Sequence, residues 1–333
     1  MKLIRLFSVL SYLFYFYFIF IFFIIRAAKK KDPLAYKFIH MFFKLIKDSF
    51  KILKRGHPLI LAASTAFFAT FSISPTIIVL VNVFSLYFKA ETITKELIDK
   101  ISLTLGARAG KDIEGIVQNF TSLKSNQWIT FGGFIFLVFV ATTLLRIMQQ
   151  SIHILWHISY KPINNFPLKI FERLKALAVL LVMGILFILS LFLDASVTVA
   201  QEYLKMLNEY TLSTFIWILN VVFSVFVITV WFAILFKILP DARVAWKVAF
   251  RGGMLTATCT YLGRLLLGKI LVQGNISTIF GASTSFALIL LFIFYSSFII
   301  YFGAAFTYVY GKYIGCPIIP DKNTDSYEEV VIS

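Results

Sequence analysis

A chain of 333 residues that is 59% hydrophobic, with a mean hydropathy of +0.86, has the composition of a membrane protein. These values exclude an ordinary soluble domain. The formal net charge of +16 therefore needs an explanation at the membrane before one that involves nucleic acid.

Apolar segments recur along the whole chain. A helix that crosses a bilayer needs about 20 apolar residues, because unpaired backbone groups are costly in hydrocarbon. Seven segments meet this requirement: 6–25, 59–88, 125–145, 176–200, 210–236, 248–268 and 282–310. The sequence thus predicts an all-α fold, a polytopic helical membrane protein.

The first apolar segment lies within residues 1–30, and its heavier positive charge follows the apolar residues. A secretory signal carries that charge before its apolar part. We therefore expect an uncleaved anchor helix with its amino end outside. The alternative is a dispensable leader.

Residues 31–58 have the pattern of a basic amphipathic helix. Lys37, Lys44 and Lys51 recur every seven residues, as do His40, Lys47 and Lys54, and the opposite side carries Leu34, Phe38, Phe42, Leu45 and Ile52. This pattern is typical of a helix that lies on the membrane surface. A helix that binds a calmodulin-like partner would have the same spacing. Gly56-His57-Pro58 is expected to end this helix and begin the next.

Charge alternates between the loops. Residues 26–57 hold ten Lys or Arg against two acids, 146–175 hold five against one, and 237–251 hold four against one, whereas 89–127 hold six against five. Segments 201–213 and 270–281 have no basic excess either. The basic loops are therefore expected in the cytoplasm, together with the acidic tail 316–333. Membrane lipids with anionic headgroups are the expected partners on that side, and Cys259 and Cys316 are expected to be free thiols.

The outer loop 89–127 is too long for a turn. Ile93, Leu97 and Ile101 have helical spacing, as do Ile113, Val117 and Phe120. Two short helices separated by Gly106 and Gly110 are expected.

Polar residues within the predicted spans are the candidate functional residues. Asp194 and Arg264 are costly in a bilayer and lie at similar depth, so they predict a charged constriction or, alternatively, a structural pair. Pro75 removes one helical hydrogen bond, which Ser72 and Ser74 could compensate, and it indicates either a hinge or a fixed kink. Asn82 and Asn220 are typical of polar contacts between helices.

Catalytic motifs are absent from the sequence. His153 and His157 share one helix face, but no acidic residue accompanies them in the pattern of a metal site. No nucleophile elbow or phosphate-binding loop occurs. We expect no cofactor, no metal site and no enzyme activity.

Four short motifs follow one another over residues 34–315. They are Ala62-Ala63-Ser64-Thr65-Ala66-Phe67-Phe68 with Ser72-Ile73-Ser74-Pro75, then Trp156 with Lys161, then Leu239-Pro240-Asp241-Ala242-Arg243-Val244-Ala245-Trp246, and finally Phe280-Gly281-Ala282. In order and spacing they resemble the YihY/BrkB family of bacterial inner-membrane proteins.

The resemblance implies a six-helix core over 59–315, to which this chain adds its first helix. It also marks Pro240, Asp241, Arg243 and Gly281 as residues of family motifs. Gly303-Ala304-Ala305 stands where the family commonly has Gly-Ala-Glu, so a role that requires this Glu would be missing here.

Three functions follow as hypotheses. The first is a non-enzymatic, transport-like protein that moves a solute, lipid or amphiphile through a cavity between helices. The second is a membrane-bound ribonuclease, the name that members of the family long carried, in which basic loops would hold RNA without specific recognition. The third is an envelope-integrity scaffold with no substrate.

Overall fold

The computed structural model describes residues 33–84, 90–105, 110–111, 113–115, 117–118, 127–160, 173–186, 210–273, 284–321 and 324–326. By its contacts the chain divides into two compact units, Met1–Lys51 and Ile52–Ser333. Each unit is considered by itself.

Helix α2 (Pro33–Arg55) confirms the helix predicted from the sevenfold spacing. All six Lys and His residues of its predicted basic face are exposed, whereas Leu45 on the other side is buried. Phe43 is 66% exposed on the same helix. Exposed aromatic side chains beside a row of lysines are what an interfacial helix presents to lipid; its place on the membrane surface stays a prediction.

The break after α2 lies where the sequence predicted it. Gly56 is buried, and a Cβ atom there would lie 2.6 Å from a side-chain carbon of Leu155. His57 adopts a φ of 52°, and its carbonyl accepts the N–H of Leu61 at 3.2 Å. The carbonyl of His57 therefore caps the next helix, which begins at Pro58, a position where proline is well tolerated.

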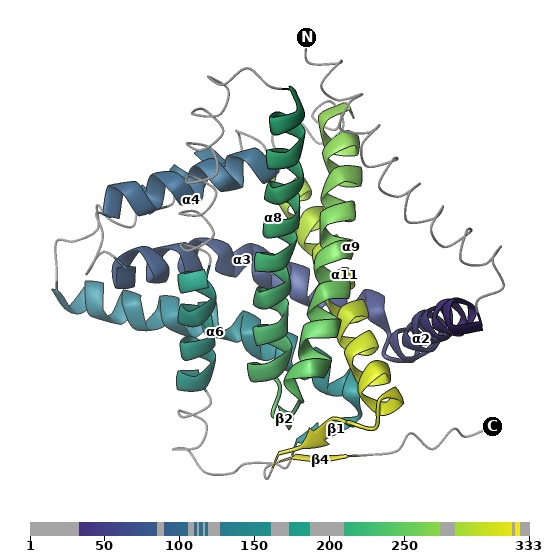
Figure 1. The fold of residues 1–333 in the computed structure, drawn as a ribbon. Coiled ribbons are helices and arrows are strands. Elements are labelled where there is room, and N and C mark those ends of the chain that lie inside the picture. The colour runs from purple at the N-terminus through teal and green to yellow at the C-terminus, as the bar shows by residue number, and fades with distance from the viewer. Residues whose placement is uncertain are drawn as a thin grey trace. The chain divides into compact units, whose positions relative to one another are not determined.

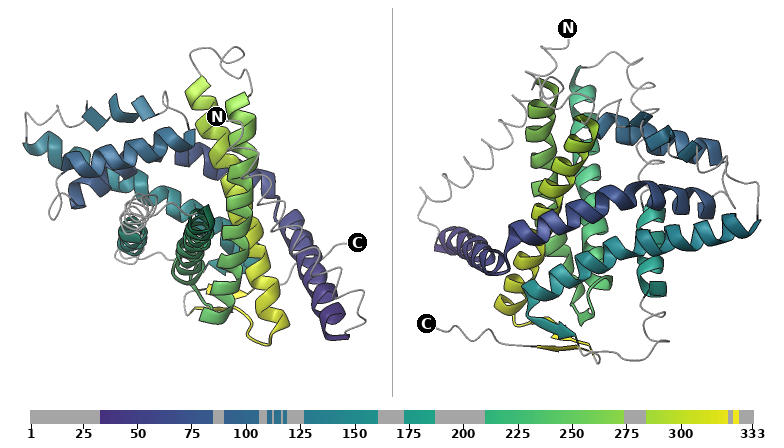
Figure 2. Two further views of the ribbon diagram at one scale, coloured as in Figure 1. Left: turned by 45° about the horizontal axis from the view of Figure 1, so that its top comes forward. Right: turned by 180° about the vertical axis from the view of Figure 1, so that it is seen from behind.

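Helices make up most of the second unit. They are α3 (Pro58–Phe84), α4 (Ala90–Leu105), α6 (Gln127–Trp156), helical residues 173–186, α8 (Tyr210–Ile238), α9 (Trp246–Gln273) and α11 (Thr284–Tyr313). Figure 1 shows their arrangement, and α8 and α9 lie side by side in each view of Figures 1 and 2.

The core of the second unit surrounds α11. This helix packs against α3, α6 and α9, and its residues 301–307 are all buried. Elsewhere large apolar side chains point outward, among them Phe71, Phe136 and Phe226. Outward apolar side chains along helices whose inner sides are packed are expected where lipid is the solvent.

In its described part, the structure supports fewer membrane spans than the seven that the sequence predicted. By length and composition, two helices within the described ranges can cross a bilayer, Ile135–Trp156 and Phe286–Tyr313, and a third is possible if His40–Arg55 and Pro58–Ile73 form one broken span. The chain is therefore an all-α helical membrane protein. The six-helix core stays a prediction, and the first helix, 6–25, falls outside the described residues.

Loop 89–127 contains helix as predicted. Its first helix is α4, and residues 110–111, 113–115 and 117–118 are helical as well. Gly110 is buried, and a Cβ atom there would lie 1.9 Å from the Oγ of Ser102 on α4. The two parts of the loop thus pack closely at this glycine.

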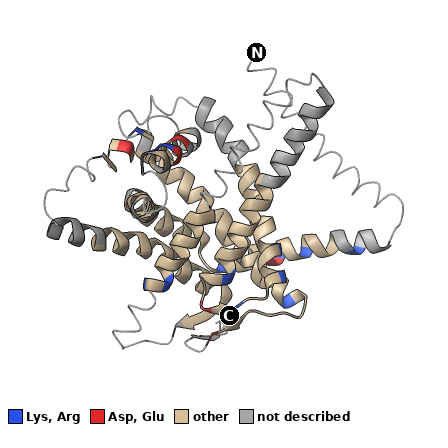
Figure 3. Cartoon of the chain, turned by 60° about the vertical axis from the view of Figure 1, so that its left-hand side comes forward, with Lys and Arg blue, Asp and Glu red and all other residues tan. Residues whose placement is uncertain are grey.

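Four short strands were not predicted. They are β1 (Ile158–Tyr160), β2 (Ala242–Arg243), β3 (Ile319–Pro320) and β4 (Thr324–Ser326). β1 pairs antiparallel with β4, and β2 pairs antiparallel with β3. The carboxyl-terminal tail therefore binds both the segment after α6 and the connection between α8 and α9. Lys and Arg gather at this end of the second unit (Figure 3).

Candidate functional site

Asp241 lies in the short connection between α8 and α9 and is held by three neighbours. One carboxylate oxygen accepts a hydrogen bond from Lys175 Nζ, and the other accepts one from Gln149 Nε2 at 2.7 Å. The backbone N–H of Asp241 donates to His153 Nε2 at 3.0 Å. We call Asp241, Lys175, Gln149 and His153 the Asp241 network.

Helix periodicity explains why two of these partners act together. Gln149 and His153 are one turn apart on α6, so both face the same connection. Because His153 Nε2 accepts a hydrogen bond, that nitrogen carries no proton here, and a neutral ring carries its proton on Nδ1. The Asp241 carboxylate has only 14% of its side-chain surface exposed, so its charge depends on these donors.

The connection itself is short and tightly held. Pro240 is buried and follows directly after Leu239, whose N–H makes the last helical bond of α8 to Leu235 at 3.0 Å. Lys237 Nζ donates to the carbonyl of Val244 and lies 5.8 Å from the centre of the Trp246 ring. These contacts turn the chain from α8 back into α9 and present Asp241 to α6.

A gap of about 10 Å³ lies beside the Asp241 network. It is lined by Gln149, Lys175, Ala176, Val179, Leu239 and Asp241. This volume is about what one water molecule needs. The charged residues therefore fill the junction between α6, the helical residues 173–186 and the α8–α9 connection.

The carboxyl-terminal tail fixes the other side of the connection. The Asp321 N–H donates to the Asp241 carbonyl at 3.1 Å, and Arg243 Nε lies 3.6 Å from Asp321 Oδ1. Both side chains of that ion pair are mostly exposed, so it contributes little by itself.

His153 and His157 do not converge on one site. His153 contacts the Asp241 backbone, whereas the His157 ring packs on Tyr308 of α11, with 5.7 Å between ring centres. His157 also has a φ of 57°, which turns the chain out of α6 and into β1. Within the described ranges, no three His, Cys, Asp or Glu side chains gather as metal ligands would.

Three buried hydroxyls join α3, α6 and α11. Tyr301 is fully buried, and its hydroxyl is hydrogen-bonded to Thr65 Oγ1 and to Ser151. Thr65 also bonds the Leu61 carbonyl at 2.9 Å, and Ser151 bonds the Ile147 carbonyl at 2.9 Å. We call these three residues the hydroxyl cluster.

Every hydroxyl of the hydroxyl cluster has a hydrogen-bond acceptor within reach. Thr65 and Ser151 each donate to a carbonyl of their own helix, and Tyr301 can donate to either of them. Nearby, Trp156 Nε1 donates to the Ala304 carbonyl at 2.9 Å. The Trp156 of the second motif is thus a buried anchor between α6 and α11.

Small residues bring α9 and α11 together. A Cβ atom at Gly252 would lie 1.9 Å from Thr307 Oγ1, and one at Gly303 would lie 1.8 Å from Thr256 Oγ1. Thr256 and Thr307 each donate to the carbonyl four residues earlier, at Gly252 and Gly303. The contact is therefore reciprocal, a glycine of each helix facing a threonine of the other.

The predicted polar residues have different outcomes. α3 continues through Pro75, and Ser72 is buried with its hydroxyl donating to the Ala69 carbonyl at 3.2 Å. Pro75 leaves a different carbonyl, that of Phe71, without its helical donor, so this bond of Ser72 does not replace the one that the proline removes.

Asp194 and Gly281 lie outside the described residues, and of Arg264, Ser74, Asn82 and Asn220 only the helical backbone is described. The proposed pairing of Asp194 with Arg264 stays a prediction. Cys259 and Cys316 are free thiols, as expected.

Sequence reasoning missed most of the Asp241 network. It marked Asp241 through the motif but counted Lys175 only as a loop charge and weighed His153 only as a metal ligand. The available signal was the spacing of Gln149 and His153, two polar residues one turn apart at the end of an apolar helix.

Comparison with known proteins agrees with these landmarks. The family described as virulence factor BrkB matches residues 50–323. A UPF0761 membrane protein of Saccharophagus degradans is 26% identical over 253 residues, which cover 74% of this chain and 54% of that protein. The chain thus spans about half the length of this relative. No solved structure matches.

The matched range contains all four motifs, the Asp241 network and the hydroxyl cluster. The chain belongs to the BrkB family of membrane proteins.

Proposed function

We propose that this protein is a non-enzymatic, transport-like protein of the cytoplasmic membrane. It moves a solute, lipid or amphiphile along a route between the helices of a six-helix core, and its carboxyl terminus lies in the cytoplasm. The Asp241 network closes the cytoplasmic end of that route.

One observation carries this proposal. The Asp241 network joins three separate elements through charged and polar contacts around a gap of about 10 Å³. Apolar packing alone would hold helices together more simply, since a half-buried ion pair gains little over apolar contacts. A set of charged contacts can, however, be exchanged for contacts with water or with a polar substrate. Such contacts suit a gate that must both close the route and open it.

Orientation follows from charge. The segments nearest to the network belong to two of the loops with a basic excess, 146–175 and 237–251, and such loops are retained in the cytoplasm. The network would then be reached from the inside, and a route through the bundle would end at the outer helices of loop 89–127.

The test uses purified protein in liposomes with two probes. A fluorescent phospholipid reports movement between leaflets, and trapped carboxyfluorescein reports passage of a small anionic solute. Asp241→Ala and Lys175→Met are expected to change the rate for at least one probe relative to the native protein. Asp321→Ala, which alters an exposed pair at the same end, serves as the matched control.

Two results would contradict the proposal. One is that native protein moves neither probe faster than empty liposomes, which would favour the scaffold without a substrate. The other is that the network variants and the Asp321→Ala control behave alike. No observation on the described part of the chain favours the ribonuclease.

A further inference from the structure

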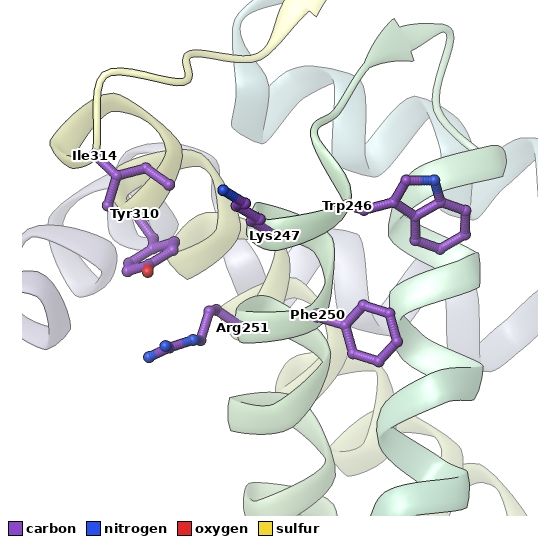
Figure 4. A pocket seen from close by; sticks show the side chains of 6 residues that line it. All are labelled: Trp246, Lys247, Phe250, Arg251, Tyr310 and Ile314. Carbon is purple, nitrogen blue, oxygen red and sulfur yellow. The ribbon is translucent and has the colours of Figure 1, made fainter.

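A second cleft lies away from the Asp241 network. It has a volume of about 400 Å³, opens between the start of α9 and the end of α11, and is lined by Trp246, Lys247, Phe250, Arg251, Tyr310 and Ile314 (Figure 4). A volume of this size is in the range of small-ligand sites.

Helix spacing sorts these side chains into two groups. Trp246 and Phe250 are one turn apart and point to one side of α9, with 6.2 Å between their ring centres. Lys247 and Arg251 are also one turn apart and point to the other side, toward Tyr310 (Figure 4). The cleft thus has a cationic side, which faces Tyr310, and an aromatic side formed by Trp246 and Phe250.

Its position along the helices matches a membrane–water boundary. The apolar span of α11 ends at Tyr313, so Tyr310 and Ile314 lie where the hydrocarbon region would end. Trp246 is 52% exposed. Tryptophan and tyrosine concentrate at the level of lipid headgroups, and lysine and arginine extend toward that level from helix ends.

Charge at the cleft is uncompensated within the described part of the chain. Neither Lys247 nor Arg251 forms a salt bridge there. Of the adjoining carboxylates whose side chains are described, Asp241 forms an ion pair with Lys175 and Asp321 one with Arg243. Two cations without a carboxylate partner favour an anionic ligand.

We infer that this cleft binds the phosphodiester headgroup of an anionic phospholipid. Lys247 and Arg251 contact the phosphate oxygens, a role for which the guanidinium fork is well shaped. Trp246 and Phe250 lie against the first carbons of the acyl chains. A free phosphate ion would contact the cations but would leave the exposed ring surfaces in water, so a lipid occupies more of the site.

This inference goes beyond the proposed function, because a bound lipid is compatible with a transporter and with a scaffold. The experiment therefore measures binding and not movement. Native mass spectrometry of the purified protein, titrated with phosphatidylglycerol or with phosphatidylcholine of the same chains, counts bound lipids and gives their affinities.

The variant Lys247→Gln/Arg251→Gln removes both cations from the cleft. Its matched control, Arg243→Gln/Lys312→Gln, removes two exposed cations from the same end of the molecule but outside the cleft. The conservative variant Lys247→Arg/Arg251→Lys keeps the charge. All four positions changed across these variants are exposed, so the fold is expected to persist.

The expected result is one phosphatidylglycerol bound in preference to phosphatidylcholine. Each cation near a headgroup contributes about fivefold in affinity, so the cleft variant should lose at least about tenfold. The control and the conservative variant should retain the preference. Equal loss in the cleft variant and the control would overturn the site.

Two competition arms separate other sources of phosphate. Inorganic phosphate at millimolar concentration should not displace the lipid; if it does so completely, the site is one for free phosphate. A short RNA should not displace it either, and displacement by RNA at moderate salt would overturn the assignment to lipid.

Discussion

At the scale of single residues, Asp241 shows how one polar residue can join several elements of a mostly apolar chain. Asp241 alone links α6, the helical residues 173–186 and the carboxyl-terminal tail through its side chain and backbone. The sequence could mark Asp241, because its motif is recognisable. It could not supply the partners, because Lys175 and Gln149 are 66 and 92 residues away along the chain and only the packing brings them together.

The Asp241–Lys175 contact can be measured by a double-mutant cycle. Asp241→Ala and Lys175→Met should each lower the free energy of unfolding by about 1.5–3 kcal/mol, the usual range for hydrogen bonds to charged groups. The double variant should lose less than the sum, since neither partner is then left alone. Denaturant titration in detergent gives the values. The exposed pair Arg243→Ala and Asp321→Ala should show a coupling of about 0–1 kcal/mol, and additive losses at Asp241 and Lys175 would show that they are not coupled.

A second prediction at this scale concerns Tyr301. Tyr301→Phe removes one hydroxyl, but Thr65 and Ser151 keep the carbonyls of Leu61 and Ile147 as acceptors. The loss should therefore be small, about 0.5–1.5 kcal/mol. Tyr301→Ala also empties a fully buried site and should cost about 3–5 kcal/mol. Similar losses for the two variants would mean that the hydroxyl, and not the ring, holds the three helices.

At the scale of elements, periodicity and turn residues were sufficient to predict most of the helices. α2 lies within the predicted range 31–58, and α3 begins at the predicted proline. The strands could not be foreseen, because two- and three-residue strands such as Ala242–Arg243 are too short to have a period. They exist only because the tail returns to pair with them.

The contact between α9 and α11 gives a prediction at the same scale. Gly303→Ala would place a methyl group 1.8 Å from Thr256 Oγ1, and overpacking of this kind costs about 1–3 kcal/mol. The melting temperature in detergent should fall, and adding Thr256→Ala should restore part of it by removing the hydroxyl. Gly115→Ala is the control, because its Cβ would meet no atom within 4 Å. An unchanged melting temperature for Gly303→Ala would show that the two helices do not depend on this close approach.

At the scale of the whole molecule, the strands constrain topology. Residues 158–160 pair with 324–326, and 242–243 pair with 319–320, so the segment after α6, the α8–α9 connection and the tail lie on one side of any membrane the chain spans. The charge pattern had assigned these three segments to one side independently. Which side that is follows from charge alone.

Cysteine labelling decides the side. In a background without Cys259 and Cys316, a cysteine at Ser122 should react with an impermeant reagent in intact cells, and one at Asn165 should react only after the membrane is opened. The reason is the basic excess of 146–175 over 89–127. Labelling at Asn165 in intact cells would invert the topology and would move the Asp241 network to the outer face.

Charge on this scale also bears on the ribonuclease hypothesis. A net charge of +16 predicts weak binding of RNA at low salt, and this binding should collapse as ionic strength rises because it depends on counterion release. Cleavage needs more than attraction. His153 is bonded to the Asp241 backbone and His157 packs on Tyr308, so the two rings have separate structural roles.

We therefore expect the purified protein to bind a tRNA precursor without processing it when Mg²⁺, Mn²⁺ or Zn²⁺ is added. The comparison is with His153→Ala/His157→Ala, which should leave RNA binding unchanged, since binding rests on Lys and Arg. The same variant should lower thermal stability, because it removes the acceptor of the Asp241 N–H and a ring that contacts α11. Metal-dependent turnover by the native protein that disappears in this variant would establish an enzyme and exclude a purely transport-like role. A loss of stability without any change in RNA cleavage or binding would instead assign both histidines to the support of the Asp241 connection.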